Sequence, residues 1–378
     1  MLDFVFWLLS YVIPFLAVLT VIVFVHEMGH YLVARLNGVA IQTFSVGFGR
    51  ELIGWTDRHG TRWRISAIPL GGYVRFLGDM NEASLPDPDA ASRIDPALAP
   101  RLFVNKSVWQ RIAVVAAQPI ANLLLTFFVL YALLVGYGRY TIPPVIGEVV
   151  AGSVAESAGL ESGDRITAVD GYVVHGFEDF QRYVATSPDR AVTVDLERAG
   201  QDVTLSLTPE ATPVEDRFGN NPRIGRIGGT RSVEEADMTL YRPGPVEAVG
   251  MTIEEIRFII QRTAAFIGDL FVGRGDVEQL GGPVKVAKVS GEVATLGIIA
   301  LINLMALLSL NIGIFNLLPI PMLDGGHLLY YFAEAIRGKP LSMRVQEIGF
   351  RFGFALVMAL MVFTVFNDTI FAYFGILR

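Results

Sequence analysis

Four long, almost uncharged stretches constrain how this chain can fold. They cover Phe4–Val25, Ile112–Gly138, Gly297–Leu318 and Phe352–Leu377, and only the last carries a charge, Asp368. A helix that crosses a bilayer needs about 20 mostly apolar residues, so each stretch can span one. The composition, 52% hydrophobic and 18% charged, is too apolar for an ordinary soluble protein. The sequence therefore predicts a polytopic α-helical membrane protein with four transmembrane helices.

Basic residues between these stretches predict how the chain is oriented. The first and third connections are rich in Lys and Arg, whereas segment 139–295 holds more acidic than basic residues. Since positively charged connections stay in the cytosol, segment 139–295 and both termini are expected outside. The net charge of -7 and the lack of a basic run give no sign of nucleic-acid binding.

The connections between these stretches have sequence patterns typical of strands and of an amphipathic helix. Residues 41–77 are strand-like and punctuated by glycine, which predicts a β-hairpin. From 143 to about 210, short β runs alternate with turns at Gly171 and Gly200. Residues 246–272 have the spacing of an amphipathic helix that lies on the outer membrane surface or packs against the β-rich region. The predicted divisions are a first membrane segment (1–138), a β-rich domain (139–211), an amphipathic linker (212–295) and a second membrane segment (296–378).

The first stretch runs into His26-Glu27-Met28-Gly29-His30. On a helix, positions i and i+4 share one face, so both imidazoles can reach one metal ion. Glu27 lies beside them and can take a proton from metal-bound water. The alternative is a helix end whose polar side chains merely face water. Ionisable groups that end a membrane span are costly and usually functional, which favours the metal site.

A third ligand is expected from the segment Asn316–His327. Because the chain has no cysteine, the ligand must be His, Asp or Glu. Asp324 would supply an oxygen, and His327, three residues later, is a rival on the same helix face. The alternative is a polar turn that closes a helix at the membrane surface. Spans one and three both run inward in the predicted orientation, so the two motifs arrive on the same side of the membrane.

Together the two motifs resemble those of the site-2 protease family of intramembrane metalloproteases, and within it the bacterial regulator-of-sigma-E proteases. His26–His30 matches the first family motif, and Asn316–Gly326 matches Asn-x-x-Pro-x-Pro-x-Leu-Asp-Gly-Gly. Residues 44–49 and 68–74 resemble the family's membrane re-entrant β segment, and Gly281–Val284 resembles a Gly-Gly-Pro step before span three. The resemblance covers nearly the whole chain.

This resemblance implies roles for individual residues. It implies Zn²⁺ held by His26, His30 and Asp324, with Glu27 as the general base. His327 then has a supporting role. Further candidates for contact with the substrate are Asn316, Pro319 and Pro321. One departure is Gln118, which precedes Pro119 where relatives often have glycine, and it puts close helix contact at 118 in doubt.

Residues 143–210 resemble a bacterial PDZ domain. The resemblance rests on Ile146–Val149, Ser157–Leu160, Gly163–Ile166 and Val169–Gly171. Such domains capture extended peptides by strand addition, and Gly147 is the candidate peptide-binding residue. A domain that serves only as a rigid cap is the alternative. Many relatives carry two PDZ domains in tandem, whereas this chain has room for one.

The predicted function is hydrolysis of single-span transmembrane proteins within or beside the lipid bilayer. The resemblance implies a bacterial inner-membrane protein of a stress response whose substrate is an anti-sigma factor already trimmed outside. Both termini and the PDZ domain would be periplasmic, with the active site towards the cytosol. One alternative is a catalytically dead, membrane-anchored PDZ adaptor, but such a relative should have lost Glu27 or a ligand. Another is a metal transporter, whose spans should carry more intramembrane ligands.

Overall fold

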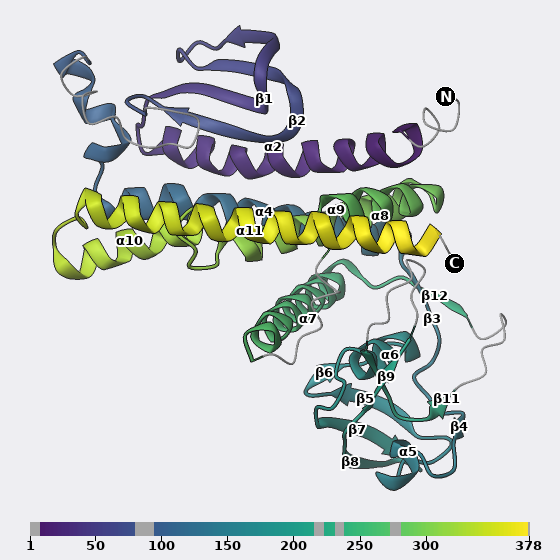
Figure 1. Ribbon diagram of the computed structural model, residues 1–378. Coiled ribbons are helices and arrows are strands. Elements are labelled where there is room, and N and C mark those ends of the chain that lie inside the picture. Colours follow the sequence, from purple (N-terminus) through teal and green to yellow (C-terminus); the bar gives the residue numbers. More distant parts are fainter. Residues whose placement is uncertain (1–7, 80–93, 215–222, 231–237, 273–280, 377–378) are drawn as a thin grey trace. The chain divides into compact units, whose positions relative to one another are not determined.

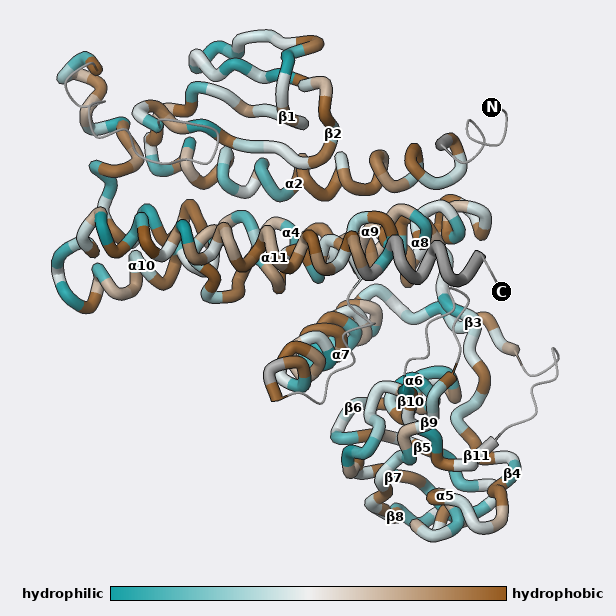
Figure 2. The backbone as a smooth tube through the Cα atoms, viewed as in Figure 1, coloured by the Kyte–Doolittle hydropathy of each residue, from teal (hydrophilic) through white to brown (hydrophobic). Residues whose placement is uncertain are grey.

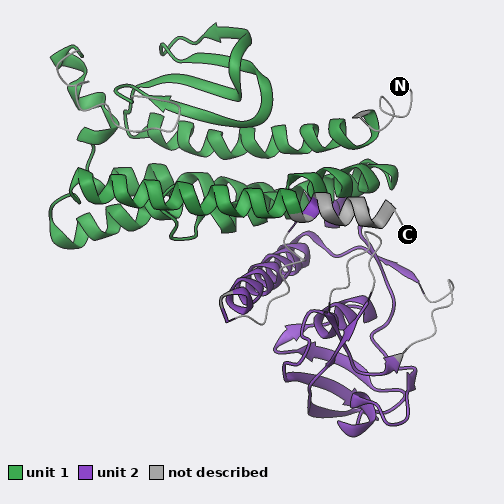
Figure 3. Ribbon diagram, in the orientation of Figure 1, with its two compact units in different colours: residues 1–130, 282–366 green, residues 131–281, 367–378 purple. Residues whose placement is uncertain are grey.

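The chain forms two compact units in the computed structural model, which describes residues 8–79, 94–214, 223–230, 238–272 and 281–376. We call residues 1–130 and 282–366 the membrane unit, and residues 131–281 and 367–378 the β-rich unit (Figure 3). Phe4 and Leu377, the predicted outer ends of spans one and four, lie outside the described residues.

Four apolar helices confirm the predicted spans (Figures 1 and 2). The first helix continues past Val25 to Leu36, because Tyr31 and Ala34 carry its buried face onward. The His-Glu motif is therefore inside a helix instead of at its end. The four helices are α2 (Ile13–Leu36), α4 (Val108–Tyr137), α9 (Ile298–Asn316) and α11 (Met343–Ile376).

Shorter helices complete the membrane unit. A π-helical turn, η1 (Leu8–Val12), precedes α2, and both contact α8 (Pro283–Thr295), which also contacts α9. After α9 the chain turns through Pro319 and Pro321 into α10 (Asp324–Arg337). The 3-10 helices η2 (Pro96–Arg101) and η3 (Phe103–Asn105) lie before α4.

The predicted hairpin is present as β1 (Ile41–Thr56) and β2 (Arg62–Phe76), which lie over α2 in Figure 1. Both strands bend, so that the two ends of β2 pair with opposite sides of β1. Phe44 of β1 pairs with Val74 on one side and with Trp63 on the other. Residues 72–76 thus form one outer edge of the sheet. Phe44 is buried and its ring packs edge-on against Tyr31 of α2, at 5.7 Å between centroids.

Asp57 holds the turn of this hairpin and ties it to α2. Its Oδ1 accepts hydrogen bonds from the backbone amides of His59 and Thr61, at 2.8 and 2.9 Å. Its Oδ2 accepts from Trp63 Nε1 and from the Tyr31 hydroxyl, both at 3.0 Å. Burial alone would raise the pKa of Asp57, but hydrogen bonding outweighs burial and lowers the pKa to about 2.

The β-rich unit contains the predicted β runs. Its main sheet has the order β6-β5-β7-β8. The turns at Asp170-Gly171 and Ala199-Gly200 have positive φ at both residues, as two-residue type I′ hairpins require. The elements of this sheet and its flanking helices are α5 (Val154–Ser157), β5 (Arg165–Val169), β6 (Tyr172–Val173), α6 (Phe177–Ala185), β7 (Val192–Arg198) and β8 (Gln201–Leu207).

Three further strand pairs belong to the β-rich unit. They are β3 (Arg139–Thr141) with β12 (Thr239–Tyr241), β4 (Glu148–Val149) with β11 (Gly229–Thr230), and β9 (Glu210–Pro213) with β10 (Arg223–Arg226). The unit therefore recruits strands from beyond residue 211, where the sequence analysis placed the start of a linker.

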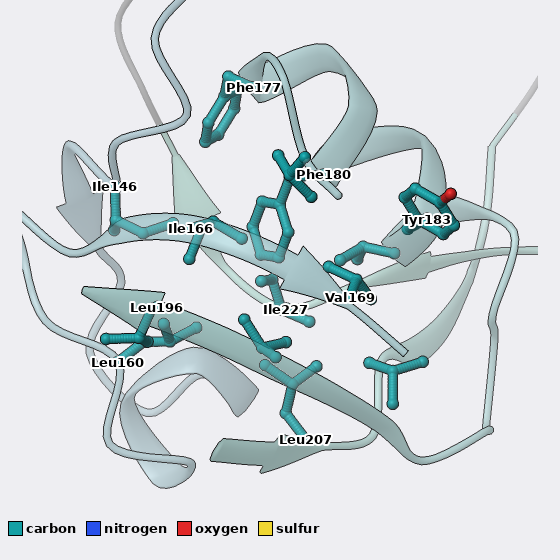
Figure 4. Packing of buried hydrophobic residues seen from close by; sticks show 14 of the residues in the cluster. Ile146, Leu160, Ile166, Val169, Phe177, Phe180, Tyr183, Leu196, Leu207 and Ile227 are labelled. Atoms are coloured by element: carbon teal, nitrogen blue, oxygen red, sulfur yellow. The ribbon is translucent and has the colours of Figure 1, made fainter. Parts of the chain in front are cut away.

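The core of the β-rich unit lies between the sheet and α6 (Figure 4). Helix α7 (Pro245–Val272) closes it, because Phe258 belongs to the core cluster and packs 4.4 Å from the Tyr183 ring. Arg182 donates two hydrogen bonds to the Glu255 carboxylate, at 2.7 and 2.8 Å. The structure shows one of the two placements predicted for this amphipathic helix, packing against the β-rich region.

The hydrogen bonds of Asp57 predict how the stability of the membrane unit depends on pH. Asp57→Ala is expected to destabilise the membrane unit by roughly 1–3 kcal/mol, because several hydrogen bonds to one carboxylate are lost. The folded pKa of about 2 lies below the ordinary value of about 3.9, so the carboxylate stabilises the fold fully above pH 4. That contribution is lost as the pH falls from 4 through 2.

Denaturant unfolding of purified protein in detergent at pH 6 and at pH 2.5 checks this. The stability difference between wild type and Asp57→Ala should shrink at the lower pH. Arg58→Ala, in the same turn and exposed, is the matched control and should leave stability unchanged at both. A difference for Asp57→Ala that is equal at the two pH values would contradict the assignment.

Candidate metal centre

The His-Glu motif lies on the buried face of α2, where it crosses α4. His26 and Glu27 are 9% and 7% exposed. Gly29 allows the crossing, because a Cβ there would lie 2.5 Å from the carbonyl oxygen of Ala117. A Cβ on Gly313 of α9 would lie 3.3 Å from the Pro119 carbonyl oxygen of α4. Close helix contact is thus kept around position 118 by glycines on the neighbouring helices.

His30 is held in one tautomer by α4. Its Nδ1 lies 2.8 Å from the carbonyl oxygen of Val114. A carbonyl can only accept, so Nδ1 carries the proton and the lone pair is on Nε2. That Nε2 faces the Asp324 carboxylate, with 3.9 Å to Oδ1. The hydrogen bond from Nδ1 to the Val114 carbonyl orients the ring so that its other nitrogen, Nε2, can bind a metal.

Asp324 reaches the site because α10 begins tightly against the end of α9. It is the first residue of α10, after the turn that contains both prolines. The next two residues are glycines, and a Cβ on Gly325 or Gly326 would collide with the carbonyl oxygens of Leu318 and Ile320, respectively. The Asp-Gly-Gly sequence therefore serves to fold the turn and to aim the carboxylate at His30.

His26 lies between two amide side chains. Its Nδ1 is 3.0 Å from Asn122 Nδ2 and its Nε2 is 3.1 Å from Asn316 Nδ2. Asn122 is fully buried, and its Oδ1 has no hydrogen-bond partner among the described residues. Turning this amide over would bring Oδ1 onto Nδ1 of His26. The proton would then be on Nδ1, and Nε2 would be free to bind a metal.

Gln118 of α4 lies at the centre of these groups, and it is 5% exposed. One end of its amide is 2.5 Å from Nε2 of His26. The other end is 2.5 Å from Nε2 of His30, and 2.9 and 3.0 Å from the two Asp324 oxygens. The contacts to both histidines and to Asp324 are hydrogen bonds when the amide oxygen faces His26 and the nitrogen faces His30 and Asp324. The three predicted ligands therefore surround one small group.

Glu27 is supported by the hairpin. The backbone of Val74 hydrogen-bonds its carboxylate. A Cβ on Gly72 would lie 3.1 Å from Glu27 Cγ and 2.7 Å from the Ser45 carbonyl oxygen, so glycine is needed where β2 passes the helix. The Glu27 carboxylate also lies 3.5 Å from the Gln118 amide. The outer edge of the sheet thus borders the site.

The side chains fit a metal in chemistry and nearly in position. As they stand, no three His, Asp or Glu side chains in the described ranges are spaced to hold an ion. The donors are nevertheless two imidazoles and one carboxylate around a common centre, which is the ligand set of a hydrolytic zinc site. The unpartnered Asn122 oxygen is the acceptor that a metal-binding His26 needs.

The other predicted site residues fall in different places. His327 lies on α10, where its ring packs edge-on near Tyr330, at 6.4 Å. Pro321 packs under α11, since a Cβ on Gly353 would lie 2.7 Å from its carbonyl oxygen. Gly147 belongs to the β-rich unit, where its carbonyl accepts a hydrogen bond from the Ser162 hydroxyl at 2.5 Å.

The sequence analysis missed the polar residues of α4 as site residues. Gln118, Asn122 and Thr126 recur every four residues within an otherwise apolar helix, which puts them on one face. Thr126 donates to the carbonyls of Asn122 and Ala306, at 3.0 and 2.9 Å. Polar groups inside a membrane helix are rare enough that this spacing was a usable signal.

Comparison with known proteins identifies the family. The model of peptidase family M50 matches residues 14–360. A protein of Rhizobium meliloti named "putative zinc metalloprotease" is 46% identical over 361 residues, which cover 95% of this chain and 96% of that protein. Metalloprotease MmpA of Caulobacter vibrioides is 37% identical over 379 residues, with 94% of each chain covered.

One solved structure is also similar to part of this chain. The PDZ domain of an SdrC-like protein from Listeria monocytogenes matches 21% of this chain and 82% of its own length. The sequence identity is 18% and the TM-score is 0.17.

Proposed function

This chain belongs to peptidase family M50, and we propose that it cleaves single-span membrane proteins within or beside the bilayer, using His26, His30, Asp324 and Glu27. It is a multi-pass membrane zinc metalloprotease, and its cofactor is Zn²⁺. What carries the proposal is the convergence of two imidazoles and one carboxylate on a common centre between the helices.

His26, His30 and Asp324 would hold the ion. His30 offers Nε2, since its Nδ1 donates to the Val114 carbonyl. His26 offers Nε2 when Asn122 accepts from its Nδ1. Asp324 would supply the third ligand, and water or substrate would take the remaining position of a hydrolytic zinc site. Bound zinc lowers the pKa of a coordinated water to about 7 and polarises a carbonyl group.

Glu27 is the proposed general base. It lies next to His26 in α2, and its carboxylate is held by the Val74 backbone. From there it can accept the proton of the attacking water and deliver it to the leaving amine. Asn316 is proposed to donate a hydrogen bond to the substrate backbone from beside His26.

The hairpin offers a way to hold the substrate. A transmembrane helix hides its peptide bonds, so the substrate must be unwound before it can be cut. Residues 72–76 form an outer edge of the sheet and border Glu27. An unwound segment that pairs with this edge would lie extended beside the proposed catalytic residues.

The proposed substrate is an anti-sigma factor already trimmed outside, in a bacterial inner membrane. The charge distribution supports an orientation with both termini and segment 139–295 periplasmic, and with the metal centre towards the cytosol. The β-rich domain, in which Gly147 directly precedes β4, would then meet the outer end of a substrate. It would exclude bulky outer domains or bind a newly exposed C-terminus.

The cleavage prediction concerns Glu27. Glu27→Gln should retain zinc and lower the cleavage rate by about 100-fold or more, because a general base contributes that much. The assay uses single-span membrane proteins with and without their outer domains. Wild type should prefer the trimmed form. Near-normal turnover by zinc-loaded Glu27→Gln would refute the proposed role, and equal cleavage of both forms would refute the proposed substrate class.

The ligand prediction separates Asp324 from His327. Asp324→Ala should lower zinc content and cleavage together, since it removes a ligand. His327→Ala is the matched control on the same helix and should change both far less. Zinc is measured by elemental analysis of purified protein. The opposite order would make His327 the third ligand.

The orientation prediction uses the absence of native cysteine. A single cysteine at Ser206, exposed in β8, should react with an impermeant thiol reagent added to spheroplasts. One at Ser342, exposed between α10 and α11, should react only after the membrane is permeabilised. Labelling of Ser342→Cys in intact spheroplasts would contradict the orientation.

A further inference from the structure

We propose that the Gln118 side chain is a built-in competitor for the metal position, whose amide closes the site and must swing out before zinc can bind. The inference rests on the ligand set proposed above. It assigns to Gln118 a positioning role in metal loading, which is separate from the chemistry of cleavage.

The geometry places the amide where an ion would be. Both ends of the Gln118 amide are within 3.0 Å of a ligand atom, at 2.5 Å from each imidazole and 2.9 and 3.0 Å from the Asp324 carboxylate. Zinc ligands lie about 2.0–2.2 Å from the ion, so an amide and an ion cannot both occupy this centre.

The hydrogen bonds form a chain across the site when the Gln118 and Asn316 amides are turned over. Asn122 donates to Nδ1 of His26, so Nε2 of His26 carries a proton and donates to the Gln118 oxygen, and Asn316, 3.1 Å away, must present its oxygen to the same Nε2. The Gln118 nitrogen donates to Asp324 and to Nε2 of His30. His30 in turn donates from Nδ1 to the Val114 carbonyl.

Loading the metal must therefore rearrange two amides. Gln118 has to leave the centre, and the His26 proton has to move from Nε2 to Nδ1 while the ring stays neutral. Asn122 then has to present Oδ1, its unpartnered buried oxygen, to Nδ1. His30 needs no change, because its lone pair already faces the centre. The loss of several buried hydrogen bonds opposes zinc binding in the wild type.

Gln118→Ala should relieve this competition. Its affinity for zinc should rise by about tenfold or more, because hydrogen bonds to the ligands no longer have to be broken. After zinc is removed by chelator, the variant should unfold at a lower temperature than stripped wild type, since its ligands are left unpaired. Gln118→Glu places a carboxylate at the centre and should hold zinc longer than wild type while it loses cleavage, because the open position is filled.

The experiment uses the purified full-length chain in detergent and Zn²⁺ alone as the probe. Affinity is measured by competition with a chromophoric chelator, and thermal unfolding is measured before and after reloading. Leu124→Ala, at an exposed apolar position of the same helix, is the matched control. It should lower the unfolding temperatures of stripped and reloaded protein equally and leave zinc affinity unchanged.

The outcomes separate the alternative roles. Weaker zinc binding by Gln118→Ala would mean that the amide supports the bound ion, and unchanged binding would mean that it only packs. Faster zinc loss from Gln118→Glu than from wild type would also overturn the proposal. Asp324→Ala is run in parallel. If it binds zinc as wild type does, the ligand set is wrong, and that result is distinct from a failure of the Gln118 proposal alone.

Discussion

Every feature of the membrane unit depends on one constraint: polar and ionisable side chains lie among apolar helices, where unpaired polar groups are costly. The solution is pairing between neighbouring helices. The motif of α2 meets the polar face of α4, and Asn316 and Asp324 approach from the end of α9 and the start of α10. Glycines at the crossings bring these backbones close enough for short side chains to meet.

The hairpin is attached to the same helix that carries the His-Glu motif. It is fixed to α2 by Phe44 against Tyr31 and by the Asp57 carboxylate, which Tyr31 also contacts. Tyr31 follows His30 directly in the sequence, so the anchor of the sheet and the metal centre share one turn of helix. The edge of the sheet is thereby held beside Glu27, where the proposed substrate segment would lie extended.

Much of this architecture could be predicted from the sequence, because it follows from local patterns. Apolar length predicted the four helices. A strand-like pattern with glycines predicted the hairpin, short β runs with turns predicted a β-rich domain, and spacing indicated His26, Glu27 and His30. Pairing between distant segments could not be read this way. The strands recruited beyond residue 211 and the packing of Phe258 into the core depend on tertiary contacts. Gln118 was noted only as a lost glycine, because a single sequence does not show what its side chain faces.

The central claim is that one zinc ion is held by two imidazoles and one carboxylate between the helices. Zinc K-edge X-ray absorption of the purified full-length protein tests it most directly. The account predicts a shell of nitrogen and oxygen at about 2.0–2.2 Å, with the multiple-scattering signature of two imidazoles. A signature of three imidazoles, or of none, would contradict it.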